Sequence, residues 1–314
     1  MFPLRRRRSA VHLVLGCVAL AILMIQLHTS ERQDHSYTYR QGYDIYGYTS
    51  HKDTRTSDTC PNTTRFLDRP MRLTVFASYP GSGNTWLRYL IERMTGYATG
   101  SNWSDKQLLE KGFIGEFVKN ESTIVVKTHN DYNPSARTSV ESSKRVILLL
   151  RNPYDTLLAE FNRYYMGGDH VAHAYVSTFI KHWNKFFKDS CKKWQPYYSN
   201  WLRCPNVKVV LFDDLKADLR SQLSHIADFL DDGSLKVNVD CALHHNEGHF
   251  RRDRSFQPHT NFFYDFTEVR AVNKAIDILQ ADLKHRFPLQ NINISSWKIN
   301  FAFYKSSKNK TTRG

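Results

Sequence analysis

The sequence predicts a three-layer α/β fold with a central parallel sheet, preceded by one transmembrane helix. Three observations support this prediction: short apolar runs that alternate with stretches of helical periodicity, a glycine-rich turn between the first such run and the first helix, and an uncharged apolar segment near the N-terminus. At 314 residues the chain is long enough for one large domain with short extensions. We therefore expect a single folded domain.

The short apolar runs indicate strands, and the stretches between them indicate helices. Nearly continuous apolar runs are typical of parallel strands that are buried on both faces, and they occur at residues 72–78, 123–126, 145–150 and 207–212. Apolar residues recur at helical spacing in residues 85–94, 154–165, 171–188, 216–230 and 267–287. Such alternation predicts a parallel sheet between helices, with ligands at the carboxyl ends of the strands.

The apolar segment at residues 11–27 follows directly on four arginines at positions 5–8. Its length is at the short end for a transmembrane helix. The basic flank favours a cytoplasmic N-terminus, so the remaining chain is expected in the lumen of the secretory pathway. A cleaved signal peptide is the alternative, and it is disfavoured because residues 26–30 offer no small-residue cleavage site.

The chain divides by composition around this span. Residues after the span are polar and rich in tyrosine without apolar periodicity, which is typical of a stem. The predicted organisation is a cytoplasmic tail (1–10), a signal-anchor (11–27), a lumenal stem (28–70), a folded lumenal domain (71–304) and a disordered basic tail (305–314).

Cysteines and glycosylation sequons are consistent with a lumenal domain. Cys17 lies in the predicted span, which leaves four cysteines for disulfides in an oxidising compartment: Cys60, Cys191, Cys204 and Cys241. Three connectivities are possible, and we favour Cys60 with Cys241 and Cys191 with Cys204. No pair has the close spacing of a zinc site, and no metal is expected. Sequons follow the span at Asn62, Asn102, Asn120, Asn293 and Asn309.

The net charge of +14 is concentrated at the two ends of the chain. Residues 5–8 supply four positive charges and residues 305–313 supply four more, which leaves six for the body. The sequence contains no helix-turn-helix, zinc-finger or RNA-binding signature, so a nucleic-acid partner is not expected. A moderately basic body suits a small polyanionic cofactor or an acidic glycan.

The strongest local signal is the segment YPGSGNTW at positions 79–86, between the first expected strand and helix. Its glycines allow the backbone to curl around an anion, and the N–H groups and dipole of the following helix favour a phosphate. A nucleoside-triphosphate P-loop is excluded because it would require glycine at Ser78 and lysine at Asn84. A glycine-rich turn without a ligand is the alternative.

This segment resembles the 5′-phosphosulfate loop of sulfotransferases, and three further matches follow in the family's order. Residues 125–129 (VVKTH) resemble the IKTH segment with the catalytic histidine. Residues 145–165 resemble the unit whose arginine binds the 3′-phosphate, and residues 209–218 resemble the later strand with its YEDLKxDP continuation. Within the family, the residues of the first and third of these segments are most similar to the WSC-domain-containing (WSCD) Golgi branch, which is associated with sulfation of sialic acid. This chain lacks the cysteine-rich WSC modules of that branch.

The resemblance implies a Golgi type II membrane enzyme with a P-loop-like sulfotransferase fold. It would transfer a sulfuryl group from 3′-phosphoadenosine 5′-phosphosulfate (PAPS) to a hydroxyl of a glycan or glycoprotein, with sialic acid as the acceptor that the branch suggests. His129 is then the expected general base, and Lys127 the cation at the leaving phosphate. The expected donor-binding residues are Pro80, Gly81, Ser82, Gly83, Asn84 and Thr85 for the phosphosulfate, Trp86 for the adenine, Arg151 for the 3′-phosphate, and Arg251 and Arg252 as further phosphate candidates.

Two positions depart from the pattern of the cytosolic members. Gly81 stands where a lysine contacts the sulfuryl group, which leaves charge neutralisation to Lys127 or Arg88. Ala159 stands where a serine helps to bind the 3′-phosphate. These departures keep open a lumenal glycan-binding or scaffold protein that has lost turnover. A nucleotide-dependent kinase is a further alternative, opposed by the missing P-loop lysine.

Overall fold

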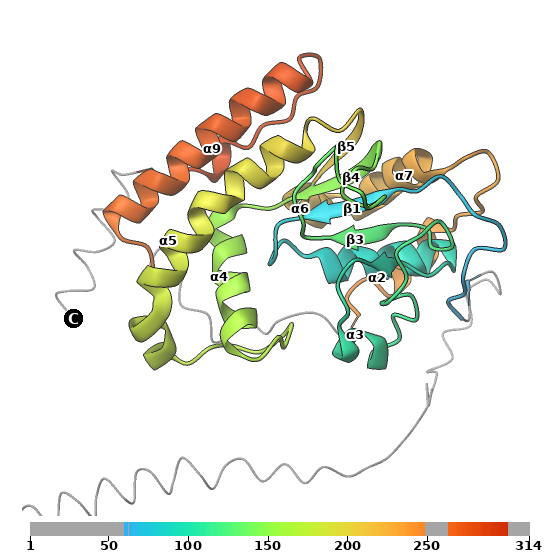
Figure 1. Cartoon of the computed structure of the whole chain (residues 1–314), viewed down its shortest axis with the longest axis horizontal. Coiled ribbons are helices and arrows are strands. Elements are labelled where there is room, and N and C mark those ends of the chain that lie inside the picture. Colours follow the sequence, from blue (N-terminus) through green and yellow to red (C-terminus); the bar gives the residue numbers. More distant parts are fainter. Residues whose placement is uncertain (1–59, 62, 249–262, 301–314) are drawn as a thin grey trace, which may run out of the picture. The chain divides into compact units, whose positions relative to one another are not determined.

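The computed structural model describes residues 60–61, 63–248 and 263–300 (Figure 1). The predicted cytoplasmic tail, membrane span, basic tail and most of the stem lie outside these ranges, as do Arg251, Arg252, Asn62 and Asn309. Within the ranges, no helix is both long and apolar enough to cross a membrane.

Five parallel strands form the central sheet, which confirms the predicted α/β architecture. In sequence order they are β1 (Val75–Ser78), β2 (Gly100–Ser101), β3 (Val126–Thr128), β4 (Arg145–Leu150) and β5 (Asn206–Leu211). Their order across the sheet is β2-β3-β1-β4-β5, and every neighbouring pair is parallel. The strand predicted at 123–126 is displaced, since β3 begins only at Val126.

The predicted helices are present with changed bounds, and two short helices at residues 106–110 and 239–244 were not predicted. The helices are α2 (Asn84–Thr95), α3 (Lys106–Glu110), α4 (Pro153–Tyr165), α5 (Val176–Trp201), α6 (Phe212–Ala217), α7 (Leu219–Leu230), α8 (Val239–His244) and α9 (Phe266–Arg286). Helix α5 runs well beyond the predicted end at residue 188, because further buried aromatic residues continue its apolar face. The stretch predicted as one helix at 216–230 is divided at Asp218, whose carboxylate accepts from the Ser221 N–H and caps α7.

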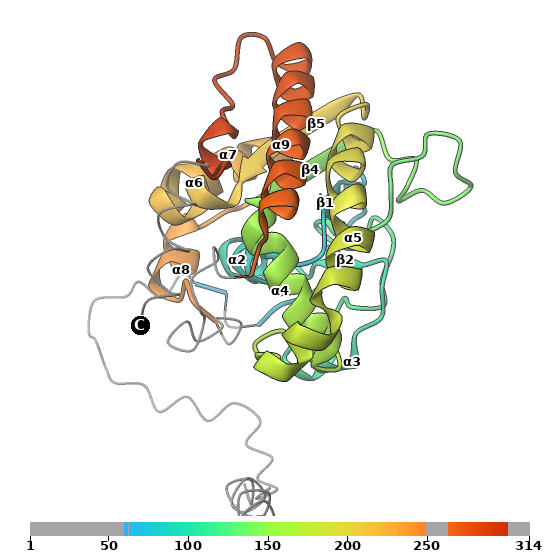
Figure 2. The ribbon, with the colours of Figure 1, turned by 90° about the vertical axis from the view of Figure 1, so that its left-hand side faces the viewer.

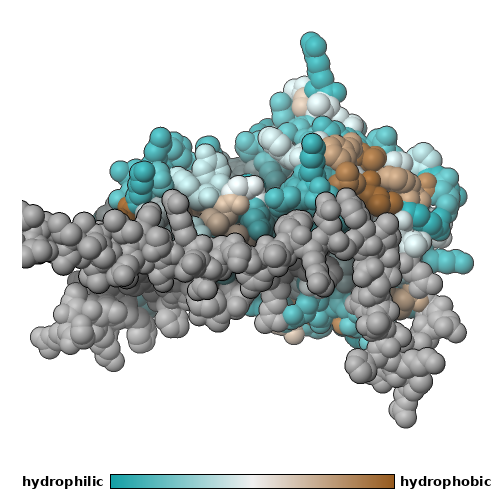
Figure 3. Space-filling model, turned by 90° about the horizontal axis from the view of Figure 1, so that it is seen from below, coloured by the Kyte–Doolittle hydropathy of each residue, from teal (hydrophilic) through white to brown (hydrophobic). Residues whose placement is uncertain are grey.

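The helices cover both faces of the sheet, which gives the predicted three layers (Figures 1 and 2). Successive β4 side chains point to opposite faces. Leu148 packs in a core cluster with residues of α4, α5 and α9, whereas Ile147 and Leu149 pack in a second cluster with residues of α2, α7 and α8. A short 3-10 helix, η2 (Ser295–Trp297), packs against α9. Figure 3 shows that the described surface on one face is mostly hydrophilic, with hydrophobic side chains gathered in one region.

One of the two favoured disulfides is present, and the other prediction is wrong. Cys60 is bonded to Cys241 of α8, whereas Cys191 and Cys204 are free. Cys191 lies ten residues before the end of α5. A helix rises 1.5 Å per residue, so about 15 Å of helix separates Cys191 from the segment that carries Cys204, whereas bonded cysteines need Cα atoms within about 7 Å.

Candidate active site

A cavity of about 830 Å³ lies at the carboxyl ends of β1, β3 and β4. The segment 80–86 follows β1, His129 follows β3 and Arg151 follows β4, and each contributes to its lining. Strand β1 has β3 on one side and β4 on the other, so the chain changes direction across the sheet here. Such switch points are where open α/β sheets bind ligands. The structure therefore brings the separate sequence matches together in one place.

The loop after β1 requires glycine at position 81. Gly81 has φ of 85°, in the left-handed region. A β-carbon there would lie 2.4 Å from the carbonyl oxygen of Thr156 and 2.9 Å from the backbone nitrogen of Glu160, both in α4. A lysine at this position would thus collide with backbone atoms in addition to straining its own. The departure from the cytosolic pattern follows from close packing of the loop on α4.

Helix α2 presents its amino end to the cavity. Its N-cap is Gly83, with φ of 94° and no side-chain cap. The N–H groups of Asn84, Thr85 and Trp86 lie in the first turn, where a helix supplies no internal acceptors. All three residues line the cavity. This end of α2 is therefore suited to bind an anion.

Ser82 has a different place from the other predicted loop residues. Its side chain is buried, its N–H lies 3.2 Å from the Tyr79 carbonyl oxygen, and it does not line the cavity. The Tyr198 hydroxyl donates to the Leu149 carbonyl oxygen at 3.1 Å, and therefore accepts from the Ser82 hydroxyl at 3.0 Å. Ser82 thus fixes the loop to α5 and β4.

His129 is held in one tautomer. Its Nδ1 lies 2.7 Å from the Ser78 carbonyl oxygen. Because a carbonyl only accepts hydrogen bonds, Nδ1 carries the proton in the neutral ring and Nε2 carries the lone pair. Burial, followed by the charge of Lys127, lowers the pKa of His129 to about 3. The ring is therefore neutral at physiological pH, with Nε2 able to accept a proton.

Lys127 lies two residues before His129 and lines the same cavity. Its Nζ is 3.9 Å from the Glu116 carboxylate. Burial and the nearby Arg88 lower the pKa of Lys127 to about 8. The alternative expectation, that Arg88 supplies the charge, is wrong: Arg88 is fully buried and does not line the cavity, and its Nη1 lies 2.7 Å from Glu116.

Arg151 and Trp86 lie at the other end of the cavity from His129. Arg151 Nη1 donates to the Gly81 carbonyl oxygen at 2.9 Å, and its guanidinium carbon is 4.6 Å from the centre of the Phe212 ring. Trp86 is partly buried, and its Nε1 donates to the Asn246 carbonyl oxygen at 2.5 Å. Both residues line the cavity, as does Ala159.

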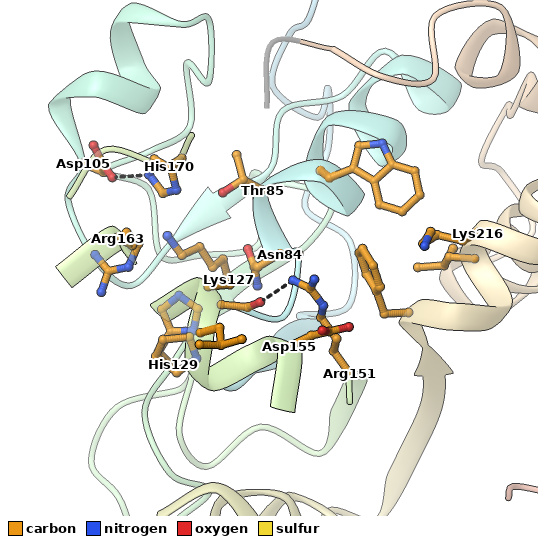
Figure 4. Close-up of a pocket in the computed structure, with 18 of the residues that line it drawn as sticks. Asn84, Thr85, Asp105, Lys127, His129, Arg151, Asp155, Arg163, His170 and Lys216 are labelled. Carbon is orange, nitrogen blue, oxygen red and sulfur yellow. Dashed lines mark hydrogen bonds and ion pairs between the residues drawn. The ribbon is translucent and has the colours of Figure 1, made fainter. Parts of the chain in front are cut away.

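Sequence reasoning missed one wall of the cavity, formed by Trp103, Asp105, Arg163 and His170. His170 Nε2 lies 3.0 Å from Asp105, and Arg163 binds Glu160 through Nε and Nη2 at 2.7 and 2.6 Å. Figure 4 shows His129, Arg163 and His170 at one side of the cavity and Arg151 and Lys216 at the other, with Lys127 between them. These residues follow no spacing that a sequence motif would reveal. In the part of the chain that the structure describes, no cluster of His, Cys, Asp or Glu could hold a metal ion.

Comparison with known protein families gives a match over most of the folded region. The family model described as "Sulfotransferase domain" matches residues 73–260. WSCD family member CG9164 of Drosophila melanogaster is 40% identical over 197 residues, and WSCD family member AAEL009094 of Aedes aegypti is 39% identical over 197 residues. Each alignment covers 60% of this chain and 60% of the insect protein. The chain thus spans 60% of the length of these relatives.

More distant similarities are also found. Human sulfotransferase 6B1 is 27% identical over 171 residues, which is 50% of this chain and 54% of that protein. Among solved structures, mouse sulfotransferase SULT7A1 complexed with PAP has a TM-score of 0.44 and 17% identity, covering 77% of this chain and 90% of that one. Retinol dehydratase in complex with androsterone and inactive cofactor PAP has a TM-score of 0.42 and 14% identity, covering 72% and 84%.

Proposed function

Because the chain belongs to the sulfotransferase family, we propose that it transfers a sulfuryl group from PAPS to a hydroxyl of a glycan or glycoprotein. One observation carries the proposal: the amino end of α2, the Lys127 ammonium and a neutral His129 with a fixed tautomer meet in a single cavity. These are an anion site, a cation and a base, which are the groups that sulfuryl transfer requires.

In the proposed reaction, His129 Nε2 accepts the proton of the acceptor hydroxyl. The acceptor oxygen forms a bond to sulfur while the bond from sulfur to the 5′-phosphate oxygen breaks, so 3′-phosphoadenosine 5′-phosphate (PAP) leaves with the additional negative charge. By analogy with phosphoryl transfer, this charge grows on the leaving oxygen in a loose transition state. The N–H groups of α2 and the Lys127 ammonium are placed to stabilise it.

The low pKa of His129 is compatible with this role. Lys127 is the second cause of the lowering, after burial. An anionic donor bound beside Lys127 opposes its charge and raises the pKa of His129. The imidazole of His129 then becomes a stronger base only when the donor is bound. In the empty site it stays neutral, so it remains able to accept a proton when the donor binds.

The other end of the cavity is suited to the nucleotide of the donor. We assign the phosphosulfate to the loop and the first turn of α2, the adenine to Trp86 and the 3′-phosphate to Arg151, whose planar guanidinium offers two parallel donors. Arg251 and Arg252 remain candidates for the same phosphate. Lys216 also lines this end and adds positive charge there.

The wall near His129 supports a carbohydrate acceptor, and we propose sialic acid. Trp103 lines the cavity with 54% of its surface exposed, which gives an apolar face on which a sugar ring can pack. Arg163 lies at the same end, and its five donors allow it to bind a sugar carboxylate in addition to Glu160. The similarity to WSCD proteins is the second support.

We further propose that the domain lies in the Golgi lumen, anchored by residues 11–27. The basic flank of this segment and the apolar residues within it support a type II orientation. The Cys60–Cys241 disulfide adds support, because such bonds form and persist in oxidising compartments.

Binding of nucleotides to the full chain, purified in detergent and followed by calorimetry, tests the donor assignment. We expect PAP to bind in clear preference to 5′-AMP and to ATP with magnesium. Arg151→Ala should weaken PAP binding by about 1.5–3 kcal/mol, the scale of a charge-assisted hydrogen bond, and leave 5′-AMP unaffected. Arg220→Ala is the matched control, since the exposed Arg220 pairs with Asp240 and does not line the cavity.

A transfer assay with labelled PAPS and sialylated or desialylated glycoproteins tests the reaction. Sulfate should appear only on the sialylated acceptor, and Trp103→Ala should raise the acceptor KM without changing PAP affinity. PAP binding without transfer to any glycan would replace the proposal with a glycan-binding scaffold. A preference for magnesium-bound ATP would instead favour a kinase.

A further inference from the structure

A buried group of charged side chains lies directly behind Lys127. Arg88 of α2 and Glu116 of the segment before β3 are both fully buried, and Lys127 itself is only 5% exposed. Charges are seldom placed so deep unless each one is paired. The arrangement of this group therefore calls for a functional explanation.

The backbone around Gly115 brings Glu116 into the interior. A β-carbon on Gly115 would lie 2.6 Å from the Thr99 carbonyl oxygen. The backbone at Gly115 therefore lies closer to the backbone at Thr99 than any residue with a side chain would allow. Phe113 lies against the guanidinium of Arg88, with 4.4 Å between the carbon of that group and the ring centre. The loop is thus packed so that the Glu116 carboxylate faces two cations.

One carboxylate bridges the two cations. Glu116 Oε2 is 2.7 Å from Arg88 Nη1, and Glu116 Oε1 is 3.9 Å from Lys127 Nζ. Arg88 is held from the other side by Thr99, since its Nε and Nη2 donate to the hydroxyl and carbonyl oxygens of that residue at 2.8 and 3.1 Å. Only Lys127 of these residues lines the cavity. Glu116 consequently acts on the cavity through Lys127 alone.

We propose that Glu116 is a positioning residue, which keeps the Lys127 ammonium charged and directed into the cavity. The catalytic importance of this effect rests on the proposed function, in which Lys127 stabilises the leaving phosphate. Without the carboxylate, Lys127 would face the permanent charge of Arg88 in a desolvated environment. Lys127 also interacts electrostatically with four other titratable groups: Asp105, His129, Arg163 and His170.

The direction of the electrostatic effects agrees with this role. Burial and Arg88 lower the pKa of Lys127, whereas Glu116 and Asp105 raise it, and the result is about 8. An opposite charge within 4–6 Å moves a pKa by about one to three units. Removal of the Glu116 charge should therefore bring the pKa of Lys127 to about 7 or below.

Competitive acetylation of the full chain tests the proposal directly, because only the neutral amine reacts. Limiting acetic anhydride is added at a series of pH values, and the labelled fraction of Lys127 is measured by peptide mass spectrometry. In Glu116→Gln, the midpoint should fall by about one pH unit or more relative to the unmodified chain. An unchanged midpoint overturns the proposal.

Glu92→Gln is the matched control. Glu92 is similarly buried and accepts hydrogen bonds from Thr99, but it does not contact Lys127. Its substitution should leave the Lys127 midpoint unchanged. If Glu116→Gln does not fold, as judged by circular dichroism, Glu116→Asp decides the matter: the shortened carboxylate should shift the midpoint in the same direction by a smaller amount, and no shift overturns the proposal.

The pH profile of PAP affinity supplies a second readout. For a one-unit fall of the Lys127 pKa, Glu116→Gln should bind PAP about 3-fold more weakly at pH 7.5 and normally at pH 6. In a Lys127→Arg background the same substitution should have no pH-dependent effect, because arginine stays charged. A shift that persists in this background overturns the proposal. If the chain binds no PAP at any pH, the proposed function fails, whereas the acetylation result still decides the role of Glu116.

Discussion

Replacement of Gly81 by alanine tests how tightly the loop after β1 is packed. The added β-carbon meets the Thr156 carbonyl oxygen at 2.4 Å, and Gly81 has φ of 85°. A left-handed backbone costs an L-residue about 1–2 kcal/mol, and overpacking of a well-packed site costs about 1–3 kcal/mol. We therefore expect Gly81→Ala to lower the free energy of unfolding by about 2–5 kcal/mol.

Gly168→Ala separates the two contributions. Gly168 also has a left-handed backbone, with φ of 91°, but nothing lies within 4 Å of its added β-carbon. This variant should lose only the backbone component, about 1–2 kcal/mol. Urea unfolding of both variants, followed by tryptophan fluorescence, measures the difference. An equal decrease in the free energy of unfolding in the two variants would refute the packing argument. A lysine at position 81 would then no longer be excluded by packing against α4.

The same comparison extends to ligand binding. Displacement of the loop from α4 moves the Gly81 carbonyl oxygen, which accepts from Arg151. We therefore expect Gly81→Ala to weaken PAP binding, whereas Gly168→Ala should not. If Gly81→Ala unfolds more easily yet binds PAP normally at low temperature, the loop would have a structural role only.

Three further predictions concern other parts of the molecule. His129→Ala should lower turnover by about 100-fold or more with PAP affinity nearly unchanged, and a collapse of both would contradict its assignment as the base. Burial raises the pKa of Glu92 to about 7. Between pH 4.5 and 7 the folded state therefore keeps a proton on Glu92 that the unfolded chain loses. The free energy of unfolding should fall by about 3 kcal/mol as the pH rises through this range. Thermal unfolding should show this fall and its absence in Glu92→Gln. For a lumenal domain, peptide mapping should find glycans on the exposed Asn120 and Asn293 and none on Asn102, whose side-chain amide donates to a carboxylate at 2.8 Å.

Much of the sheet could be predicted because its strands are strongly apolar. The run RVILLL is β4 with the predicted bounds, and all six of its residues are buried. Strand β2 could not be predicted, since it consists of Gly100 and Ser101 alone and depends on pairing with β3. Its position is set by distant contacts that leave no local pattern.

The candidate site was predictable where a charged or titratable side chain lies at the end of an apolar strand. Lys127, His129 and Arg151 each lie at or just after the end of an apolar run, and parallel strands bring such ends together. Glu116 was not predictable, because its partners come from α2 and β3 and a buried carboxylate has no sequence periodicity. The orientation of Ser82 away from the cavity depends on Tyr198, which is also distant in sequence.

The Cys60–Cys241 disulfide has a mechanical consequence. It joins residues 181 positions apart, and all five strands lie within the covalent loop that it closes. A pulling force that enters through the chain before Cys60 therefore passes across the bond into α8, which packs on α2. The strands between the two cysteines stay unloaded, so tension on the N-terminal side cannot peel β1 from the sheet until the bond is reduced. A protease cut within the loop would likewise leave both fragments joined.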